Sequence, residues 1–244
     1  MIATIKLRIP IFLILILSFL SHPSIADTPA KVYRAAMGPP EEIRSANGFY
    51  PRGMDGSRPN QPPPNINLWD HTNGADTGMS RHDSGYVSTT TSRGFAISWV
   101  NDHLNHNGYV YHIDPTPNFI DVNGTLRNYS PHPEELEFAA LGFVYWGQII
   151  GWERVRSGTI GPFVPNPDYR RGLYGGLSSG GAQPQLAGFP AGHPAWVQNP
   201  WAEFANCDLK SSCYPIQTAE DVGTDFFLHT YRKIIAPVLF STLN

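Results

Sequence analysis

Charged residues are scarce in this chain of 244 residues. Asp, Glu, Lys and Arg together make up 15% of it, and the formal net charge is −3. Proteins that bind nucleic acid normally carry a basic run or a basic face, and the sequence shows no basic run. We therefore expect no nucleic-acid partner.

A hydrophobic run long enough to span a membrane is also missing. The apolar stretch at residues 9–20 is interrupted by Pro10 and is shorter than the roughly 20 residues of a transmembrane helix. Lys6 and Arg8 precede it and Ser24-Ile25-Ala26 follows it, which is the pattern of a cleaved export signal. A buried N-terminal helix is the alternative, which Pro10 disfavours. We predict a signal peptide at residues 1–26 and a secreted mature chain with 15 basic and 20 acidic residues, net charge −5.

Cysteine is limited to Cys207 and Cys213. In an oxidising compartment two such neighbours are expected to form a disulfide. A loop this short contributes only about 2 kcal/mol by restricting the unfolded chain. The bridge has two interpretations, which stay open on these residues alone. It either holds two pieces together after proteolytic cleavage at Lys210, or is a local staple in a loop that is never cut.

Glycine and proline, by contrast, are abundant, at 23 residues each. No collagen-like period accompanies them and aromatic residues reach 12%, so a loop-rich globular fold is indicated. Residue patterns predict strands over 109–113 and 148–155, and helices over 92–105 and 133–140. Near the C-terminus, Thr218 is a candidate cap for a helix with apolar residues at helical spacing up to Val238. That apolar stripe must dock either on the preceding region or on another protein.

The segment SPHPEELE at residues 130–137 carries two carboxylates, Glu135 and Glu137, two residues apart. In an extended segment both project to the same side, and their repulsion raises the pKa of one toward use as a general base. The alternative is an acidic first turn of a helix that starts at Pro133. Taken alone, the segment favours the helix start, because acidic first turns are common.

Three further segments carry candidate site residues. Arg34 follows a strand-forming tyrosine and has the planar fork that binds phosphate or carboxylate, Ser88 lies in RHDSGYVSTTT, and His71 ends NINLWDH. Each has an ordinary structural alternative: a surface arginine, a cross-strand hydroxyl and a core histidine. His103 and His106 are the nearest approach to a metal site, and since a solvated helix face explains them, we expect no metal.

Together, in one order along the chain, these segments resemble the A subunits of cholera toxin and the heat-labile enterotoxins. The resemblance runs from Val32-Tyr33-Arg34 through NINLWDH, RHDSGYVST, SPHPEELE, GQIIGWERV and LAGFPAGHPAW to the Cys-loop-Cys element. It implies an α+β fold: a loop-rich ADP-ribosyltransferase fold with two small sheets around an NAD cleft, plus a C-terminal helical tail. It also implies a mono-ADP-ribosyltransferase that uses NAD as substrate and modifies an arginine of a host protein.

The resemblance assigns roles to matching residues. Glu137 becomes the catalytic glutamate that stabilises charge on the ribose, and Glu135 orients the acceptor guanidinium and helps to remove its proton. His71 lines the nicotinamide end of the cleft. Arg34 supports the NAD site and neutralises phosphate, and Ser88 braces the catalytic glutamate. The positions expected to bind NAD are Arg34, Ala35, His71, Ser88 and Thr89.

The same resemblance divides the chain. Residues 27–206 form an A1 catalytic domain, residues 207–213 a disulfide activation loop cut at Lys210, and residues 214–244 an A2 helical tail that docks a homopentameric B subunit. The protein is exported and assembled in the periplasm, and A1 acts in the host cytosol. The implied target is the stimulatory G-protein α subunit, which raises cAMP, with a host ADP-ribosylation factor as a candidate activator. Residues 70–84 are expected to move when the uncut form is activated.

One departure from the family pattern keeps a second interpretation open. After Arg34 the family carries an acidic and a basic residue where this chain has Ala36 and Gly38. The alternative is therefore a catalytically weakened homologue that serves mainly as a structural partner of the B pentamer.

Overall fold

The computed structural model describes residues 28–56, 63–77, 82–208 and 212–241. The predicted signal peptide at residues 1–26 and the predicted cleavage position Lys210 lie outside these ranges. Within them, the expected disulfide between Cys207 and Cys213 is present.

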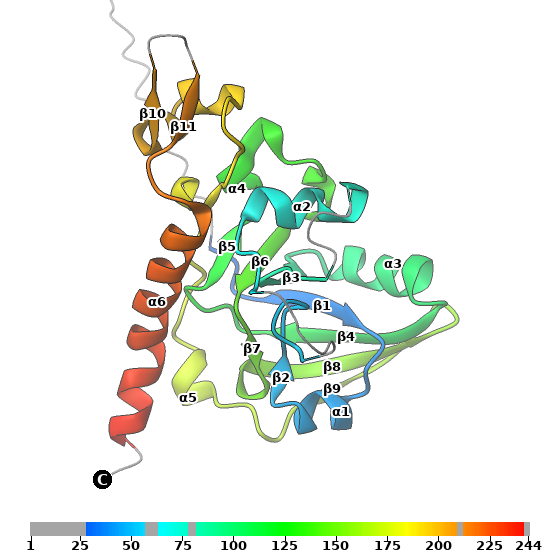
Figure 1. Cartoon of the computed structure of the whole chain (residues 1–244). Coiled ribbons are helices and arrows are strands. Elements are labelled where there is room, and N and C mark those ends of the chain that lie inside the picture. The colour runs from blue at the N-terminus through cyan, green and yellow to red at the C-terminus, as the bar shows by residue number, and fades with distance from the viewer. Residues whose placement is uncertain (1–27, 57–62, 78–81, 209–211, 242–244) are drawn as a thin grey trace, which may run out of the picture.

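The centre of the fold is an antiparallel seven-stranded sheet in the order β5-β6-β3-β1-β4-β8-β9 (Figure 1). Its strands are β1 (Val32–Ala36), β3 (Tyr86–Thr90), β4 (Asn107–Ile113), β5 (Phe119–Asp121), β6 (Glu137–Leu141), β8 (Ile149–Arg156) and β9 (Thr159–Pro165). Two further pairs are β2 (Gly48–Phe49) with β7 (Val144–Tyr145), and β10 (Ala205–Cys207) with β11 (Cys213–Pro215).

The α-helices are α1 (Pro40–Ser45), α2 (Leu68–Thr77), α3 (Arg93–His103), α4 (Val122–Leu126), α5 (Arg171–Tyr174) and α6 (Ala219–Ser241). Among the described residues, α6 is the longest α-helix at 23 residues, α3 and α2 have 11 and 10, and the others have six or fewer. Single 3₁₀ turns are η1 (Arg127–Tyr129), η2 (Pro133–Glu135), η3 (Trp146–Gln148), η4 (Pro184–Leu186), η5 (Pro194–Val197) and η6 (Trp201–Phe204). The α+β class is thus confirmed. In the described ranges the strands form one seven-stranded and two two-stranded sheets instead of two small ones, because β1 pairs with both β3 and β4 and so joins strands distant in sequence into one sheet.

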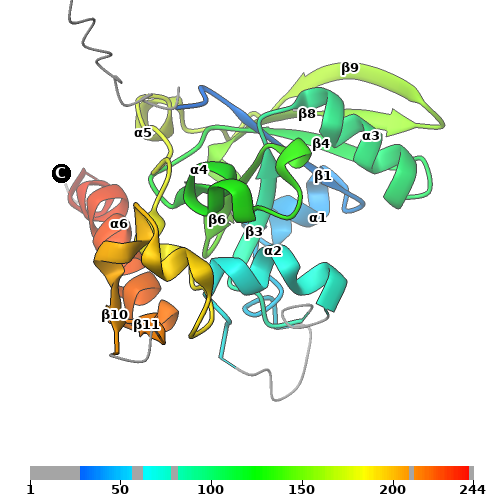
Figure 2. The same cartoon turned by 90° about the horizontal axis from the view of Figure 1, so that it is seen from above.

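Successive side chains along a strand point to opposite faces of the sheet, and both faces of this sheet are apolar. On β4, Val110 packs with Ala96 and Val100 of α3, while Tyr111 packs on the opposite face with Phe49 of β2. Helix α3 begins where the side chain of Ser92 accepts a hydrogen bond from the backbone N–H of Phe95 (3.1 Å), and its buried Ala96 and Val100 pack it against the sheet (Figure 2).

Most local predictions are confirmed and one is wrong. The strands predicted over 109–113 and 148–155 and the helix predicted over 92–105 agree with β4, β8 and α3 to within two residues. The helix predicted over 133–140 is wrong, because helical structure there is limited to η2. Leu136 adopts a left-handed conformation (φ 49°), and Glu137–Leu141 then pairs with β3 and β5 on either side. These sheet pairings outweigh the helical signals of the acidic segment.

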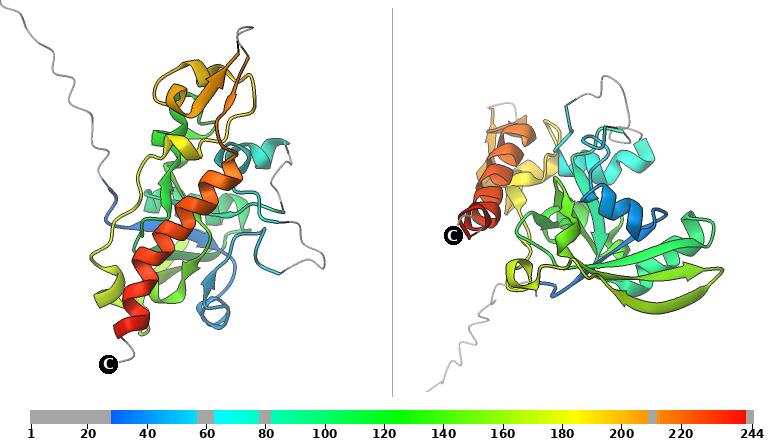
Figure 3. Two further views of the ribbon diagram at one scale, coloured as in Figure 1. Left: turned by 60° about the vertical axis from the view of Figure 1, so that its left-hand side comes forward. Right: turned by 90° about the horizontal axis from the view of Figure 1, so that it is seen from below.

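The predicted C-terminal helix is confirmed as α6, which runs along the outside of the sheet domain (Figures 1 and 3). Thr218 Oγ1 accepts a hydrogen bond from the backbone N–H of Asp221 (3.1 Å) at its start. Its apolar side docks on the preceding region of the same chain, where the rings of Phe227 and Phe143 lie 5.7 Å apart. Among the described parts of the chain, no helix combines the length and apolar character needed to cross a membrane.

Candidate active site

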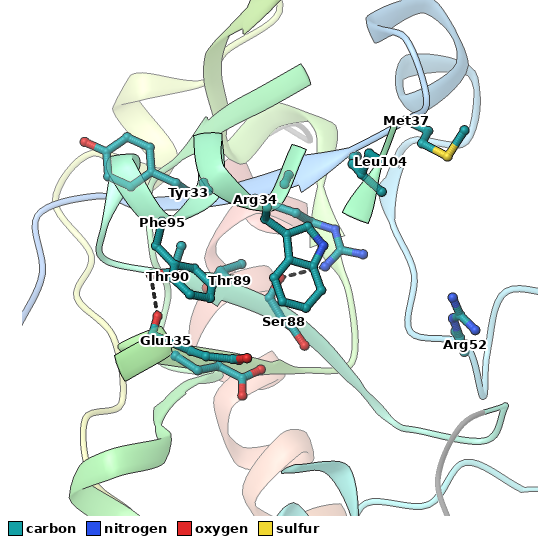
Figure 4. Close-up of a pocket in the computed structure, with 15 residues that line it drawn as sticks. Tyr33, Arg34, Met37, Arg52, Ser88, Thr89, Thr90, Phe95, Leu104 and Glu135 are labelled. Atoms are coloured by element: carbon teal, nitrogen blue, oxygen red, sulfur yellow. Dashed lines mark hydrogen bonds between the residues drawn. The ribbon is translucent and has the colours of Figure 1, made fainter. Parts of the chain in front are cut away.

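A cavity of about 490 Å³ opens between strands β1 and β3, helix α3 and the segment that joins η2 to β6 (Figure 4). Its charged lining groups are Arg34, Arg52, Glu135 and Glu137. Of the residues predicted to form the site, those that line this one cavity are Arg34, Ala35, Ser88, Thr89, Glu135 and Glu137. The tertiary structure therefore brings together six positions from three separate segments.

Two threonines of β3 fix the segment that carries the glutamates. Thr90 Oγ1 donates a hydrogen bond to the backbone carbonyl of Glu135 (2.6 Å), and Thr89 Oγ1 donates one to that of Phe138 (2.5 Å). Glu137 is the first residue of β6, where it pairs with Thr90. The turn between the glutamates is therefore anchored on both sides, and both glutamates line the same cavity.

The carboxylate of Glu137 is buried and bound to a histidine from another element. His71 of α2 places Nε2 3.0 Å from Glu137 Oε1, and its Nδ1 lies 2.8 Å from Ser84 Oγ. Ser84 Oγ–H can donate to Nδ1, so these contacts are satisfied when His71 carries its proton on Nε2. Ser88 Oγ lies 3.3 Å from the same nitrogen. His71 does not line the cavity, but it binds the carboxylate of Glu137, which does.

Arg34 brings a positive charge into the cavity from β1. Its Nη1 donates a hydrogen bond to the backbone carbonyl of Ser88 (2.6 Å), and its guanidinium lies 5.1 Å from the centre of the Phe49 ring. Its Nε is buried and has no hydrogen-bond partner among the described residues. Burial lowers the pKa of Arg34 to about 10, so the group stays protonated at neutral pH. An anionic ligand in the cavity would supply the missing contact.

The environments of the two glutamates separate their pKa values. Burial raises the pKa of Glu135, and the adjacent negative charge of Glu137 raises it further. Burial also opposes ionisation of Glu137, but the charge and hydrogen bond of His71, the Ser88 hydroxyl and the charge of Arg34 hold its pKa below the ordinary value. Glu137 is therefore the more readily ionised member of the pair and Glu135 the one suited to exchange a proton.

The two positions that depart from the family pattern lie at one side of the site. Ala36 lines the cavity with no charge to contribute, and the backbone carbonyl of Gly38 accepts a hydrogen bond from the Tyr111 hydroxyl (2.8 Å). Arg52, which follows β2, lines the same cavity and supplies a second cationic side chain. Sequence reasoning missed Arg52, since a lone arginine in a Pro-Arg-Gly turn carries no local signal.

Sequence reasoning also missed Ser84, Phe95 and Trp99. The four-residue spacing of Phe95 and Trp99 on the predicted helix was the available signal for a shared face.

Residues 70–77 of the segment expected to move belong to α2, and residues 78–81 lie outside the described ranges. In the part of the chain that the structure covers, no group of three or more His, Cys, Asp or Glu side chains is placed to hold a metal ion.

The antiparallel sheet, with paired glutamates, an arginine and a serine around one cavity, has the arrangement expected of an ADP-ribosyltransferase. A solved double mutant of heat-labile enterotoxin matches with a TM-score of 0.71 and 33% identity, over 87% of this chain and 96% of that chain. The family described as heat-labile enterotoxin alpha chain matches residues 8–233. The chain belongs to this family, as its resemblance predicts.

Two relatives illustrate the relationship. The A chain of heat-labile enterotoxin IIB from Escherichia coli is 44% identical over 197 residues, which cover 79% of this chain and 73% of the relative. Chelt from Vibrio cholerae, named an NAD(+)–arginine ADP-ribosyltransferase, is 42% identical over 180 residues, which cover 71% of this chain and 30% of the relative.

Proposed function

We propose that this chain is the catalytic A subunit of a secreted AB5 toxin, which transfers ADP-ribose from NAD to an arginine of a host protein. The observation that carries the proposal is the division of labour between Glu137 and Glu135, which share one cavity but have pKa values shifted in opposite directions. Family membership and the named activity of Chelt support the choice of reaction.

Glu137 acts on the NAD ribose. When the bond between nicotinamide and the ribose breaks, positive charge develops on the sugar as in glycoside cleavage. The ionised Glu137, held by His71 at 3.0 Å, stabilises that charge and accepts a hydrogen bond from a ribose hydroxyl. Arg34 and Arg52 supply the positive charge that the diphosphate needs.

Glu135 acts on the acceptor. As the arginine nitrogen forms its bond to the ribose carbon, nicotinamide leaves and one proton must be removed from the guanidinium. The raised pKa of Glu135 makes it the better base of the two carboxylates. Glu135 and Glu137 thus correspond to acceptor activation and charge stabilisation, respectively.

The organisation of the rest of the chain follows the same proposal. Cleavage at Lys210 would leave an A1 fragment (residues 27–206) tied to an A2 fragment (residues 214–244) by the bridge between Cys207 and Cys213. Reduction in the host cytosol then releases A1. We assign export to residues 1–26, docking of a B homopentamer to residues 214–244, the stimulatory G-protein α subunit as target and a host ADP-ribosylation factor as activator.

A second candidate function is supported by one observation. Ala36 and Gly38 leave no charge where the family pattern has an acidic and a basic residue. This favours a weakened enzyme that serves mainly as a structural partner of the B subunit, whereas Arg52 in the cavity argues for retained NAD binding.

The test uses protein cleaved in the 207–213 loop and reduced, incubated with labelled NAD and agmatine as an arginine mimic. We expect transfer of label, and none with Glu137→Gln at an unchanged melting temperature. We expect Glu135→Gln to lose transfer while it still hydrolyses NAD, and full transfer by that variant would contradict the acceptor role. Absence of transfer by the native chain, with B binding intact, would establish the structural alternative. A panel of G-protein α subunits then tests the target.

A further inference from the structure

Helix α3 forms one wall of the cavity with large apolar side chains. Phe95 and Trp99 lie four residues apart, so they project from the same face of the helix, and both line the cavity. Trp99 is 37% exposed. The sheet-facing side of α3 is buried through Ala96 and Val100, so the exposure of Trp99 does not reflect a loosely packed helix.

The indole of Trp99 is held by rings on both sides along the helix. The His103 ring lies 4.2 Å from it, centroid to centroid, and the Phe95 ring lies 5.9 Å from it. These neighbours restrict rotation of the indole. A flat ring already held in place loses little side-chain entropy when a second flat ring stacks on it.

The wall has a defined direction relative to the glutamates. At the start of α3, the backbone N–H of Ser92 donates to Thr90 Oγ1, which itself donates to the backbone carbonyl of Glu135 (3.0 and 2.6 Å). Figure 4 shows Phe95 on the side of Thr90 and Glu135, and Leu104 on the side of Met37. From Phe95 to Leu104 the helix rises by about 13 Å. The wall therefore leads away from the glutamates.

The far end of the wall is apolar. A Cβ atom placed on Gly108 would lie 2.9 Å from the backbone carbonyl of Ala36 and 3.3 Å from Leu104 Cδ1, so the end of α3 and the end of β1 lie close together. Met37, 65% exposed, follows Ala36 and lines the cavity. This end offers apolar side chains where the family pattern has charge.

We propose that Trp99 is the base-binding residue of this cavity and stacks against the adenine ring of NAD, a role that rests on the proposed function. With the nicotinamide ribose at Glu137 and the diphosphate near Arg34 and Arg52, the adenosine half extends along α3 toward Ala36 and Met37. Stacking on Trp99 replaces the polar contacts that the charged family residues would make. Trp99 is thus a binding residue for the substrate and has no part in the bond-breaking step.

Binding to the full chain tests this without turnover. ADP-ribose contains adenine and no nicotinamide, whereas nicotinamide mononucleotide contains nicotinamide and no adenine. Calorimetric affinities for the two ligands therefore report separately on the two ends of the cavity. Because one base–aromatic stack strengthens binding by about 5- to 150-fold, we expect Trp99→Ala to weaken ADP-ribose binding by that factor. We expect binding of nicotinamide mononucleotide to be unchanged.

The controls separate stacking from general apolar contact. Trp99→Phe keeps a ring and should retain most of the ADP-ribose affinity, whereas Trp99→Leu should not. Phe163→Ala removes an aromatic side chain of similar exposure (42%) that does not line the cavity, and should change nothing. In the transfer assay, Trp99→Ala should raise KM for NAD and leave kcat and KM for agmatine unchanged.

Three outcomes would overturn the assignment: unchanged ADP-ribose affinity in Trp99→Ala, an equal loss for nicotinamide mononucleotide, or a raised KM for agmatine in place of NAD. Each leaves the proposed function intact if the native chain binds both ligands and transfers label. A native chain that binds neither ligand would contradict the proposed function itself.

Discussion

His71 Nε2 lies 3.0 Å from Glu137 Oε1. This contact connects helix α2 to the first residue of strand β6, 66 positions later in the sequence. The same ring is held from its other side by Ser84 Oγ at 2.8 Å. The position and ionisation of the proposed catalytic carboxylate therefore depend on a helix that does not itself line the cavity. This relationship suggests the first prediction.

Replacement of His71 should impair the reaction through Glu137. In His71→Ala the carboxylate loses its hydrogen bond to Nε2, so its pKa rises. A hydrogen bond to a charged group is worth about 1.5–3 kcal/mol, which predicts a fall in kcat of about 10- to 100-fold. The measurement is steady-state transfer to agmatine, with Ser84→Ala, expected to lose less, as the graded control. An unchanged kcat in His71→Ala would show that Glu137 does not depend on this contact.

The raised pKa of Glu135 predicts a specific pH dependence. A base must be deprotonated to act, so transfer should rise with pH as Glu135 loses its proton, at a pH above the ordinary glutamate value of 4.5. Glu137, whose pKa is lowered, is already ionised there. The acidic limb of kcat/KM for transfer should thus lie at higher pH than the limb for NAD hydrolysis by Glu135→Gln. Coincident limbs would mean that Glu135 does not titrate in the transfer reaction.

The contact between Gly223 and Ile66 predicts how strongly α6 is held against the rest of the domain. Gly223 of α6 faces Ile66, and a Cβ atom placed there would lie 2.9 Å from Ile66 Cδ1. Gly223→Leu should loosen α6 by about 1–3 kcal/mol, the usual cost of overpacking. In Gly223→Ala the flexible end of Ile66 can move aside and helix propensity improves, so the effect should be small.

The readout for α6 is the rate at which residues 214–244 separate from the domain after cleavage in the loop and reduction. Hydrogen exchange of the α6 amides in the uncut chain gives the same information without cleavage. Equal release rates for the Leu and Ala variants would exclude Ile66 as a docking contact.

A buried ion pair away from the cavity predicts a pH-dependent stability. Arg93 Nε and Nη2 each donate a 2.7 Å hydrogen bond to the buried carboxylate of Glu153, and His112 Nε2 lies 2.9 Å from the same group. The hydrogen bond and charge of Arg93 hold the pKa of Glu153 below its ordinary value. A lowered pKa stabilises the fold above the unfolded-state pKa of about 4.3, and this stabilisation is lost as the pH falls through the folded-state pKa.

Arg93→Ala should accordingly lower the free energy of unfolding by about 1–3 kcal/mol at pH 7, a moderate value because the Arg93 side chain is 41% exposed. The loss should shrink as the pH is lowered to 4 and below. Urea unfolding at several pH values is the measurement, and Arg156→Ala, an exposed arginine of β8, is the control. An equal loss at every pH would assign the effect to packing of the arginine stem.

Much of this protein follows from short-range patterns. The strands at 109–113 and 148–155, the helix after Ser92 and the helix after Thr218 each depend on residues within one element, and the structure confirms them. The family could be named from motifs in fixed order, because such motifs are contiguous in sequence. The pairing of Cys207 with Cys213 required only two neighbouring thiols and an oxidising compartment.

Tertiary structure alone decided the state of the 130–137 segment. Its residues favour an acidic helix start, yet Glu137 begins strand β6, which pairs with β3 along its whole length and with β5 from Phe138 to Ala140. The separation of the two glutamate pKa values depends on His71, Ser88 and Arg34, which come from three other elements. Likewise, Arg52 carries no local signal, and the helical spacing of Phe95 and Trp99 indicates only a shared face; both Arg52 and Trp99 become candidate site residues because they line the cavity. Burial and long-range contacts set these properties, and neither is encoded in the spacing of neighbouring residues.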